Sequence, residues 1–282
     1  MTIPIYKQAA AVLALSLVAS SAVAEFDART AAAVDAAIAS EHRSAEDKVR
    51  DQYRHPRETL EFLGFRSNMK VLEVWPGGGW YTQILAAALQ DEGRLYAAQF
   101  QVNSPFDFQR RQFGKFLTML GERNDIYRKI KITHLSLPYQ LEVAPRNSVD
   151  MAVTFRNLHN WVEVPFGGGK YARLPFDAMY DALKPGGILG VVDHRWPDPA
   201  TEDPVSMNGY ISKERTIELA ESAGFRFVGE SDILYNPKDT RDHPSGVWTL
   251  PPSFALGDQD REKYAAIGES DRFLLKFEKP GE

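Results

Sequence analysis

The segment that most constrains this chain is Val-Leu-Glu-Val-Trp-Pro-Gly-Gly-Gly-Trp-Tyr, at residues 71–81. An apolar strand is followed by three consecutive glycines, and a helical pattern begins directly after them. Glycines after a strand let the backbone approach a ligand closely, and free N–H groups at the start of a helix attract anions. The segment therefore predicts a β–turn–α unit that binds a ligand with both an ammonium and a carboxylate group, through Glu73, Gly77, Gly78 and Gly79.

Strand and helix patterns alternate along most of the remaining chain. Apolar runs fall at 70–75, 94–100, 130–135, 150–155, 187–193, 226–231 and 272–278, and helical patterns at 81–89, 108–120, 176–183 and 213–223. Such alternation predicts an α/β fold with a mostly parallel sheet covered by helices on both faces. A long loop, 235–268, separates the last two strands, which predicts a reversed strand at one edge. Loops of this length in compact domains are usually functional or mobile.

Composition divides the chain into three parts. Residues 1–24 contain one charged side chain, Lys7, then an apolar stretch and the small-residue pair Ala22 and Ala24. This pattern predicts a signal peptide cleaved after Ala24 and export to a bacterial periplasm. The apolar stretch is shorter than the ~20 residues of a membrane span, so no stable membrane insertion is expected after cleavage. Residues 25–54 predict an N-terminal helical extension, and 55–282 the α/β domain.

The net charge is −5, and the basic residues are scattered along the chain. Nucleic-acid binding proteins gather basic residues into a patch, so a nucleic acid is not an expected partner, whereas a small-molecule substrate is. The chain has no cysteine, so disulfides cannot contribute to its stability.

Four segments together resemble the class I S-adenosylmethionine (SAM)-dependent methyltransferases. They are the glycine segment, Lys184-Pro185-Gly186-Gly187 before an apolar run, 148–154 followed by Asn157-Leu158-His159, and Ala223-Gly224-Phe225. The forms Glu-Val-Trp-Pro-Gly-Gly-Gly-Trp-Tyr-Thr and Val-Val-Asp-His-Arg are similar to a branch of predicted exported methyltransferase-like proteins. The resemblance implies a Rossmann-like sheet of seven strands with a reversed edge strand, and SAM as cofactor.

The resemblance also implies which residues contact SAM. Glu73 and the glycine turn would hold the methionine part, Gln99 the ribose, and Thr133 or His134 the adenine. Trp75 stands where the family usually has a glycine, and its indole would fill part of the pocket or stack on the ligand. Pro76 predicts an extended backbone at Trp75, because a residue before proline favours the β region.

Three histidines, at positions 134, 159 and 194, each follow the end of a predicted parallel strand, so the fold would bring them to one edge of the sheet. A neutral imidazole is suited to removing a proton near pH 7, and His159 or His194 is the predicted catalytic base. Polar residues beside these strand ends are the predicted substrate contacts: Arg156, Asn157, Asp193 and Arg195. No recognisable ligand spacing predicts a metal site.

These features predict a SAM-dependent methyltransferase that acts on a small molecule or a cell-envelope component. The alternative is a non-catalytic periplasmic ligand-binding protein on the same fold, because SAM is made in the cytosol and is too polar to cross a membrane unaided. A dinucleotide-dependent oxidoreductase fits less well, since its Gly-x-Gly-x-x-Gly motif would require glycine in place of Thr82.

Overall fold

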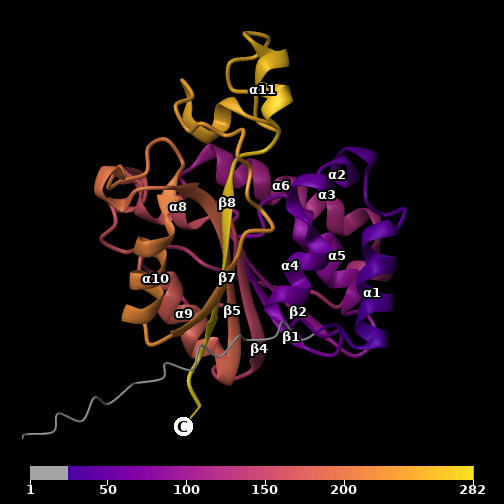
Figure 1. Cartoon of the computed structure of the whole chain (residues 1–282). Coiled ribbons are helices and arrows are strands. Elements are labelled where there is room, and N and C mark those ends of the chain that lie inside the picture. The colour runs from indigo at the N-terminus through magenta and orange to yellow at the C-terminus, as the bar shows by residue number, and fades with distance from the viewer. Residues whose placement is uncertain (1–24, 282) are drawn as a thin grey trace, which may run out of the picture.

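The computed structural model describes residues 25–281, so the predicted signal peptide lies outside the described part of the chain (Figure 1). Its centre is an eight-stranded sheet. The strands are β1 (Lys70–Val74), β2 (Arg94–Gln99), β3 (Lys131–His134), β4 (Val149–Phe155), β5 (Leu183–Trp196), β6 (Ile211–Ser212), β7 (Arg226–Ser231) and β8 (Arg272–Glu278).

The strand order is β3-β2-β1-β4-β5-β8-β7, and the short β6 pairs with the end of β5. The first five strands are mutually parallel, and β8 is antiparallel to both β5 and β7. This confirms the predicted Rossmann-like, mostly parallel sheet. The reversed strand lies one position inside the edge, because β8 inserts between β5 and β7.

Helices cover both faces of the sheet, and the central strands are apolar on both faces for that reason. Successive residues of β1 illustrate this: Val71 packs into one core cluster and Leu72 into the other. Figure 1 shows the two layers, with α4 (Pro56–Leu63) and α5 (Trp80–Ala88) on one side and α8 (Leu158–Val162), α9 (Leu174–Ala182) and α10 (Lys213–Ser222) on the other. Two further helices, α6 (Asp107–Glu122) and α7 (Asn124–Tyr127), follow β2.

The N-terminal segment forms three helices, α1 (Ala28–Ala39), α2 (Ala45–Val49) and α3 (Asp51–Arg54). The buried side of α1 shares a core cluster with α5, since Val34 and Ala37 pack in the same cluster as Ile84 and Leu85. No helix within residues 25–281 is both long enough and apolar enough to cross a membrane.

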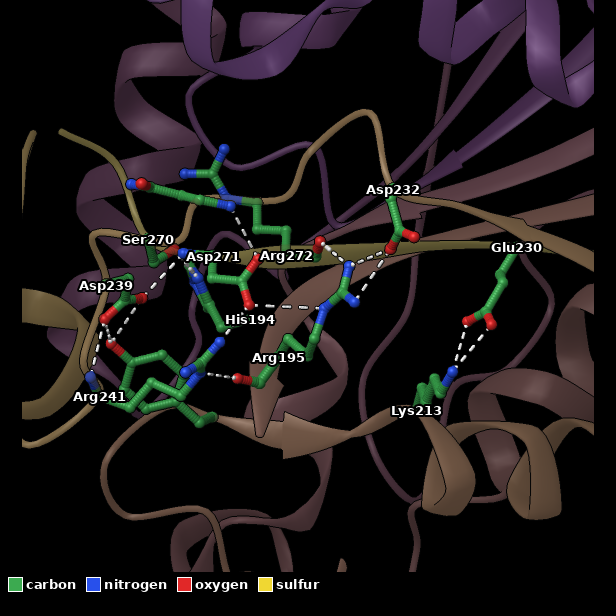
Figure 2. A network of polar contacts seen from close by, with 12 residues as sticks. His194, Arg195, Lys213, Glu230, Asp232, Asp239, Arg241, Ser270, Asp271 and Arg272 are labelled. Atoms are coloured by element: carbon green, nitrogen blue, oxygen red, sulfur yellow. Dashed lines mark hydrogen bonds and ion pairs between the residues drawn. The ribbon is translucent and has the colours of Figure 1, made fainter. Parts of the chain in front are cut away.

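The long connection between β7 and β8 lies over the carboxyl edge of the parallel strands and contains α11 (Arg261–Ile267) (Figure 1). Hydrogen bonds and ion pairs of buried polar groups hold this connection in place (Figure 2). The Asp239 carboxylate accepts hydrogen bonds from the Tyr210 hydroxyl and from the backbone N–H of Asp271, at 2.9 and 2.8 Å. The Asp271 carboxylate pairs with Arg241 and Arg195. This network fixes the start of β8 against the end of β5.

Candidate active site at the carboxyl edge of the sheet

The glycine turn joins β1 to α5, as predicted, but its backbone differs from the prediction at one residue. Trp75 has a φ of +49°, in the left-handed region, and not the extended conformation expected before Pro76. Its indole is buried against Phe100 and Trp161, and its N–H donates to the Leu135 carbonyl at 3.0 Å. Tertiary packing therefore overrides the local preference, and the indole fills the core under the turn.

Two glycines of the turn are required by its geometry. Gly79 precedes α5 with a φ of +95°, and a Cβ there would lie 2.7 Å from Met119. Gly77 has a φ of +59°, and a Cβ there would meet no atom within 4 Å. Gly77 also lines the cleft described below, so a ligand can approach the backbone closely at this position.

Glu73 does not line this cleft. Its side chain is buried, and its carboxyl group accepts a hydrogen bond of 2.6 Å from the Thr82 hydroxyl inside α5. Burial raises the pKa of Glu73 to about 8, so the group is protonated at neutral pH. The structure thus places the Glu73 carboxyl group between β1 and α5, where it supports the turn, and not at the wall of the cleft.

The other residues expected to contact SAM are also bonded within the protein. Gln99 is fully buried; its Nε2 donates to the Gly77 carbonyl at 2.8 Å, and its Oε1 accepts from the backbone N–H of Phe100. The Thr133 hydroxyl donates to the Val143 carbonyl at 2.6 Å. The His134 ring bonds the Phe100 carbonyl, outside the cleft. Gln99 therefore fixes the glycine turn, and a ribose bound there would need other partners.

A cleft opens at the carboxyl edge, where two cavities of about 550 and 660 Å³ share Gly77, Arg156 and Asn157. This size suits a small organic ligand. Its walls come from the glycine turn, the segment after β4, the end of β5, the long connection, α6 and the N-terminal helices. His159 and His194 line one of the two cavities, and of the three predicted histidines only these two lie together, with ring centroids 5.2 Å apart.

His159 and Asp193 form a hydrogen-bonded dyad at this cleft. The ring Nδ1 of His159 lies 2.8 Å from Asp193 Oδ1, and its backbone N–H donates to Oδ2 at 3.0 Å. Because an ionised carboxylate only accepts, Nδ1 carries the proton and Nε2 keeps its lone pair. Nε2 lies 3.0 Å from the side-chain amide nitrogen of Asn160. The arrangement orients His159 as a general base in the way that a carboxylate orients a catalytic histidine.

His194 sits in a different environment. Its Nδ1 bonds the Ser270 hydroxyl, and burial, followed by the charges of neighbouring groups, holds the pKa of His194 well below its ordinary value. Candidate ligand atoms of His159, Asp193 and His194 lie within 4.8 Å of one another, so the three side chains could also hold a metal ion. The oxygens of Asp193 already accept from His159 and from the backbone N–H of His194, which favours the dyad.

The predicted substrate residues separate into two groups. Arg156 and Asn157 line both cavities, and the Asn157 amide nitrogen also donates to the carbonyls of Val74 and Trp75, which fixes the turn. Arg195 lies outside both cavities and pairs with Asp232, as Figure 2 shows. Asp193 is fully buried and acts through His159.

Sequence reasoning missed several residues that line the cleft: Arg50, Glu163, Ser270 and Arg272. Trp248 comes from the connection that the sequence marks as functional or mobile, and its ring centroid lies 6.2 Å from that of His159. No periodic or motif signal identifies the others, since they come from segments far apart in the sequence.

Proteins similar to this chain are found among solved structures and not among family models or curated sequences. No protein-family model and no curated protein matches the sequence. Among solved structures, a SAM-dependent methyltransferase from Aquifex aeolicus is 16% identical, with a TM-score of 0.52 over 82% of this chain and 92% of that chain. The [4+2]-cyclase SpnF is 19% identical, with a TM-score of 0.55 over 86% of each chain.

A third similar structure is Haemonchus contortus phosphoethanolamine N-methyltransferase 2 in complex with S-adenosyl-L-methionine. It is 13% identical, with a TM-score of 0.52 over 81% of this chain and 53% of that chain. At these identities the likeness concerns the fold. The chain has the fold of the class I SAM-dependent methyltransferases.

Proposed function

We propose that this protein is a SAM-dependent methyltransferase in which His159, oriented by Asp193, removes a proton from the methyl acceptor. The observation that carries the proposal is the His159–Asp193 dyad in a cleft that also exposes the backbone of the glycine turn. The similar solved structures that are methyltransferases support it at the level of the fold.

The open side of Gly77 fits a cofactor, since nothing in residues 25–281 would occupy the space of a Cβ there. The backbone of Gly77 and Gly78 would hold the cofactor at the N-terminus of α5. When bound, SAM supplies an electrophilic methyl group on its sulfonium. The Trp80 ring lines the same cavity, but the guanidinium groups of Arg43 and Arg54 already lie over it, 5.0 and 4.4 Å from its centroid, so these cations and not the sulfonium use its faces.

The side chains of the cleft then position and deprotonate the acceptor. His159 Nε2 takes the proton, and Asp193 stabilises the imidazolium that results while keeping the ring in place. Most of the rate increase would come from holding acceptor and methyl donor in line at near-attack distance. The acceptor would be a small molecule or a cell-envelope component small enough for the cleft.

Titration calorimetry tests the cofactor directly. We expect the protein beginning at Glu25 to bind both SAM and S-adenosylhomocysteine with saturable heat below ~1 mM ligand. Substitution of Gly77 by Val should abolish that heat, because the side chain would enter the open space and disfavour the positive φ. Gly121→Val, in α6, is the matched control, since its Cβ also meets no atom. Absence of heat with the wild-type protein would refute the proposed cofactor.

Export is the second part of the proposal, and it follows from the first 24 residues. We expect the native protein to begin at Glu25 and to be released with the periplasmic contents, because Ala22 and Ala24 satisfy the small-residue rule of signal peptidase. Intact-mass measurement checks this, and a native protein that retains Met1 would contradict it.

A non-catalytic ligand-binding protein remains the second candidate. The observation that favours it is that Glu73, Gln99 and Thr133 are all bonded within the protein, which removes three polar contacts that a cofactor would use. A fold does not carry an activity by itself. Calorimetry separates the two candidates, because the binding protein would give no heat with SAM.

A further inference from the structure

Three arginines converge on one buried carboxylate beside the cleft. Glu269 accepts from Arg50 Nε at 2.6 Å, from Arg54 Nε at 3.1 Å and from the Arg272 guanidinium. The Glu269 side chain is 1% exposed. The three guanidinium groups come from the N-terminal helices and from the start of β8, so the cluster joins the two ends of the described chain at the carboxyl edge of the sheet.

A fourth guanidinium, that of Arg156, belongs to the same electrostatic cluster. Its charge interacts with those of Arg54, Arg272 and Glu269, and within residues 25–281 its side chain has no hydrogen bond and no ion pair. The residue follows β4 with a φ of +62°, a conformation that a non-glycine residue rarely adopts. Backbone strain of this kind is found at ligand-binding sites.

The positive charge of this cluster is not compensated. Four guanidinium groups share one carboxylate, that of Glu269, so the cluster carries a net excess of three positive charges. Arg50 Nη2, Arg54 Nη2 and Arg272 Nε are buried without a hydrogen-bond partner among the described residues. Burial lowers the pKa of Arg156 and lowers that of Arg54 to about 10. Guanidinium groups nevertheless keep their charge in proteins, so this buried excess of positive charge destabilises the ligand-free protein.

Acidic residues at the cleft do not remove this excess. Asp47 accepts from the Gln83 amide at 2.9 Å, and Glu163 lies near His159, where burial raises the pKa of Glu163. The basic residues that line the cleft are Arg50, Lys115, Arg156 and Arg272, and they outnumber these two acids. An anion is the ligand that would satisfy such a surface.

We infer that this arginine cluster (Arg50, Arg54, Arg156 and Arg272) binds a phosphate or carboxylate group of the methyl acceptor. Arg50, Arg156 and Arg272 line the cleft and would contact the anion, whereas the buried Arg54 adds only to the positive charge. The inference rests on the proposed function, because it assigns the anionic group to the molecule that accepts the methyl group. Arg156 and Arg272 line the same cavity as His159, so an anionic group held by them would place a neighbouring hydroxyl or amine of the same molecule beside the base. The substrate class is therefore a small anionic molecule or a phosphorylated envelope component.

Inorganic phosphate is the probe that tests the cluster without any cofactor. At constant ionic strength, we expect saturable binding of phosphate to the protein beginning at Glu25, and a rise in its melting temperature. Arg156→Gln should weaken phosphate binding about 10- to 100-fold, the range for hydrogen bonds to charged groups. Without phosphate the variant should melt at or above the wild-type temperature. The substitution breaks no side-chain hydrogen bond or ion pair of Arg156, and it removes an uncompensated charge.

Arg146→Gln is the matched control, since its side chain is 78% exposed and lies outside both cavities. Its dissociation constant for phosphate should stay within about two-fold of the wild-type value, because this side chain lies outside the cleft. Loss of its exposed ion pair should change the stability of the protein little. Equal phosphate binding by wild type and Arg156→Gln, or no binding by wild type, would overturn the inference.

A second arm separates the acceptor from the cofactor as the source of the anion. Phosphate binding should persist in saturating S-adenosylhomocysteine, and its loss there would overturn the inference, because the anion would then be the carboxylate of the cofactor. Phosphate binding with no heat from S-adenosylhomocysteine would refute the proposed cofactor and support an anion site in a binding protein. The two failures are thus distinguishable.

Discussion

Substitution of His159 by Ala is expected to lower methyl-transfer turnover by ~10²–10⁴, the contribution of a positioned general base. The affinity for S-adenosylhomocysteine should stay within a few-fold of wild type, because proton removal contributes to the rate and not to cofactor binding. The measurement is transfer of labelled methyl groups from SAM into a small-molecule extract of the cell envelope. Asp193 presents His159 Nε2 for this role, since it holds Nδ1 at 2.8 Å.

Two other histidines serve as controls for this prediction. His194→Ala should retain most of its turnover, because Nδ1 of His194 bonds Ser270 and the dyad does not include it. His134→Ala should behave as wild type, since His134 lies outside the cleft. Equal large losses in His159→Ala and His194→Ala, together with inactivation of the wild type by a chelator, would contradict the dyad and indicate a metal site at His159, Asp193 and His194.

Replacement of Glu73 by Gln is expected to remove a large pH dependence of stability. The pKa of Glu73 is raised from its ordinary 4.5 to about 8, so between these values the folded state keeps a proton that the unfolded chain has released. The free energy of unfolding of the wild type should therefore fall as the pH rises through this window, by up to about 4–5 kcal/mol at ~1.4 kcal/mol per unit. The variant, which cannot ionise there and still accepts from Thr82, should lack this fall.

Urea unfolding of both proteins at pH 5, 6.5 and 8 checks this, and the quantity of interest is the difference between them. Other groups that titrate in the window, including His194, affect both proteins alike and cancel in that difference. A constant difference across the three pH values would show that Glu73 is ionised in the folded protein. It would then be available to a cationic ligand group, as the sequence first predicts.

The sequence determined the fold. Each central strand is a short apolar run because it is buried on both faces, and the longer helices α5, α6, α9 and α10 have periodic patterns. The short helices α7, α8 and α11 have no side-chain cap, and the sequence does not predict them. Gly224 ends α10 with a positive φ, and Ser212 caps its start. These signals are local, so they can be recognised in the sequence without any knowledge of tertiary contacts. The strand-to-helix turn at Gly77 and Gly79 was predictable for the same reason.

The site was only partly predictable. Strand ends of a parallel sheet meet at one edge, which is why the sequence could place His159, His194 and Arg156 near one another. It could not decide where each side chain finds its hydrogen bonds. Gln99 and Glu73 occupy the positions expected for ligand contacts. Their side chains are instead hydrogen-bonded to Gly77 and Thr82, respectively. Trp75 lies in the left-handed region because burial of its indole outweighs the preference set by Pro76.

What the tertiary structure alone decided is the meeting of distant segments. Arg50 and Glu269 are separated by almost the whole described chain, and no spacing in the sequence links them. Their contact and the position of Arg272 in the cleft depend on how β8 inserts beside β5, whereas the dyad of His159 with Asp193 depends on the pairing of β4 with β5. Local sequence patterns specify elements and their order, whereas charges brought together across the fold are specified by packing, and it is these charges that give the cleft its chemistry.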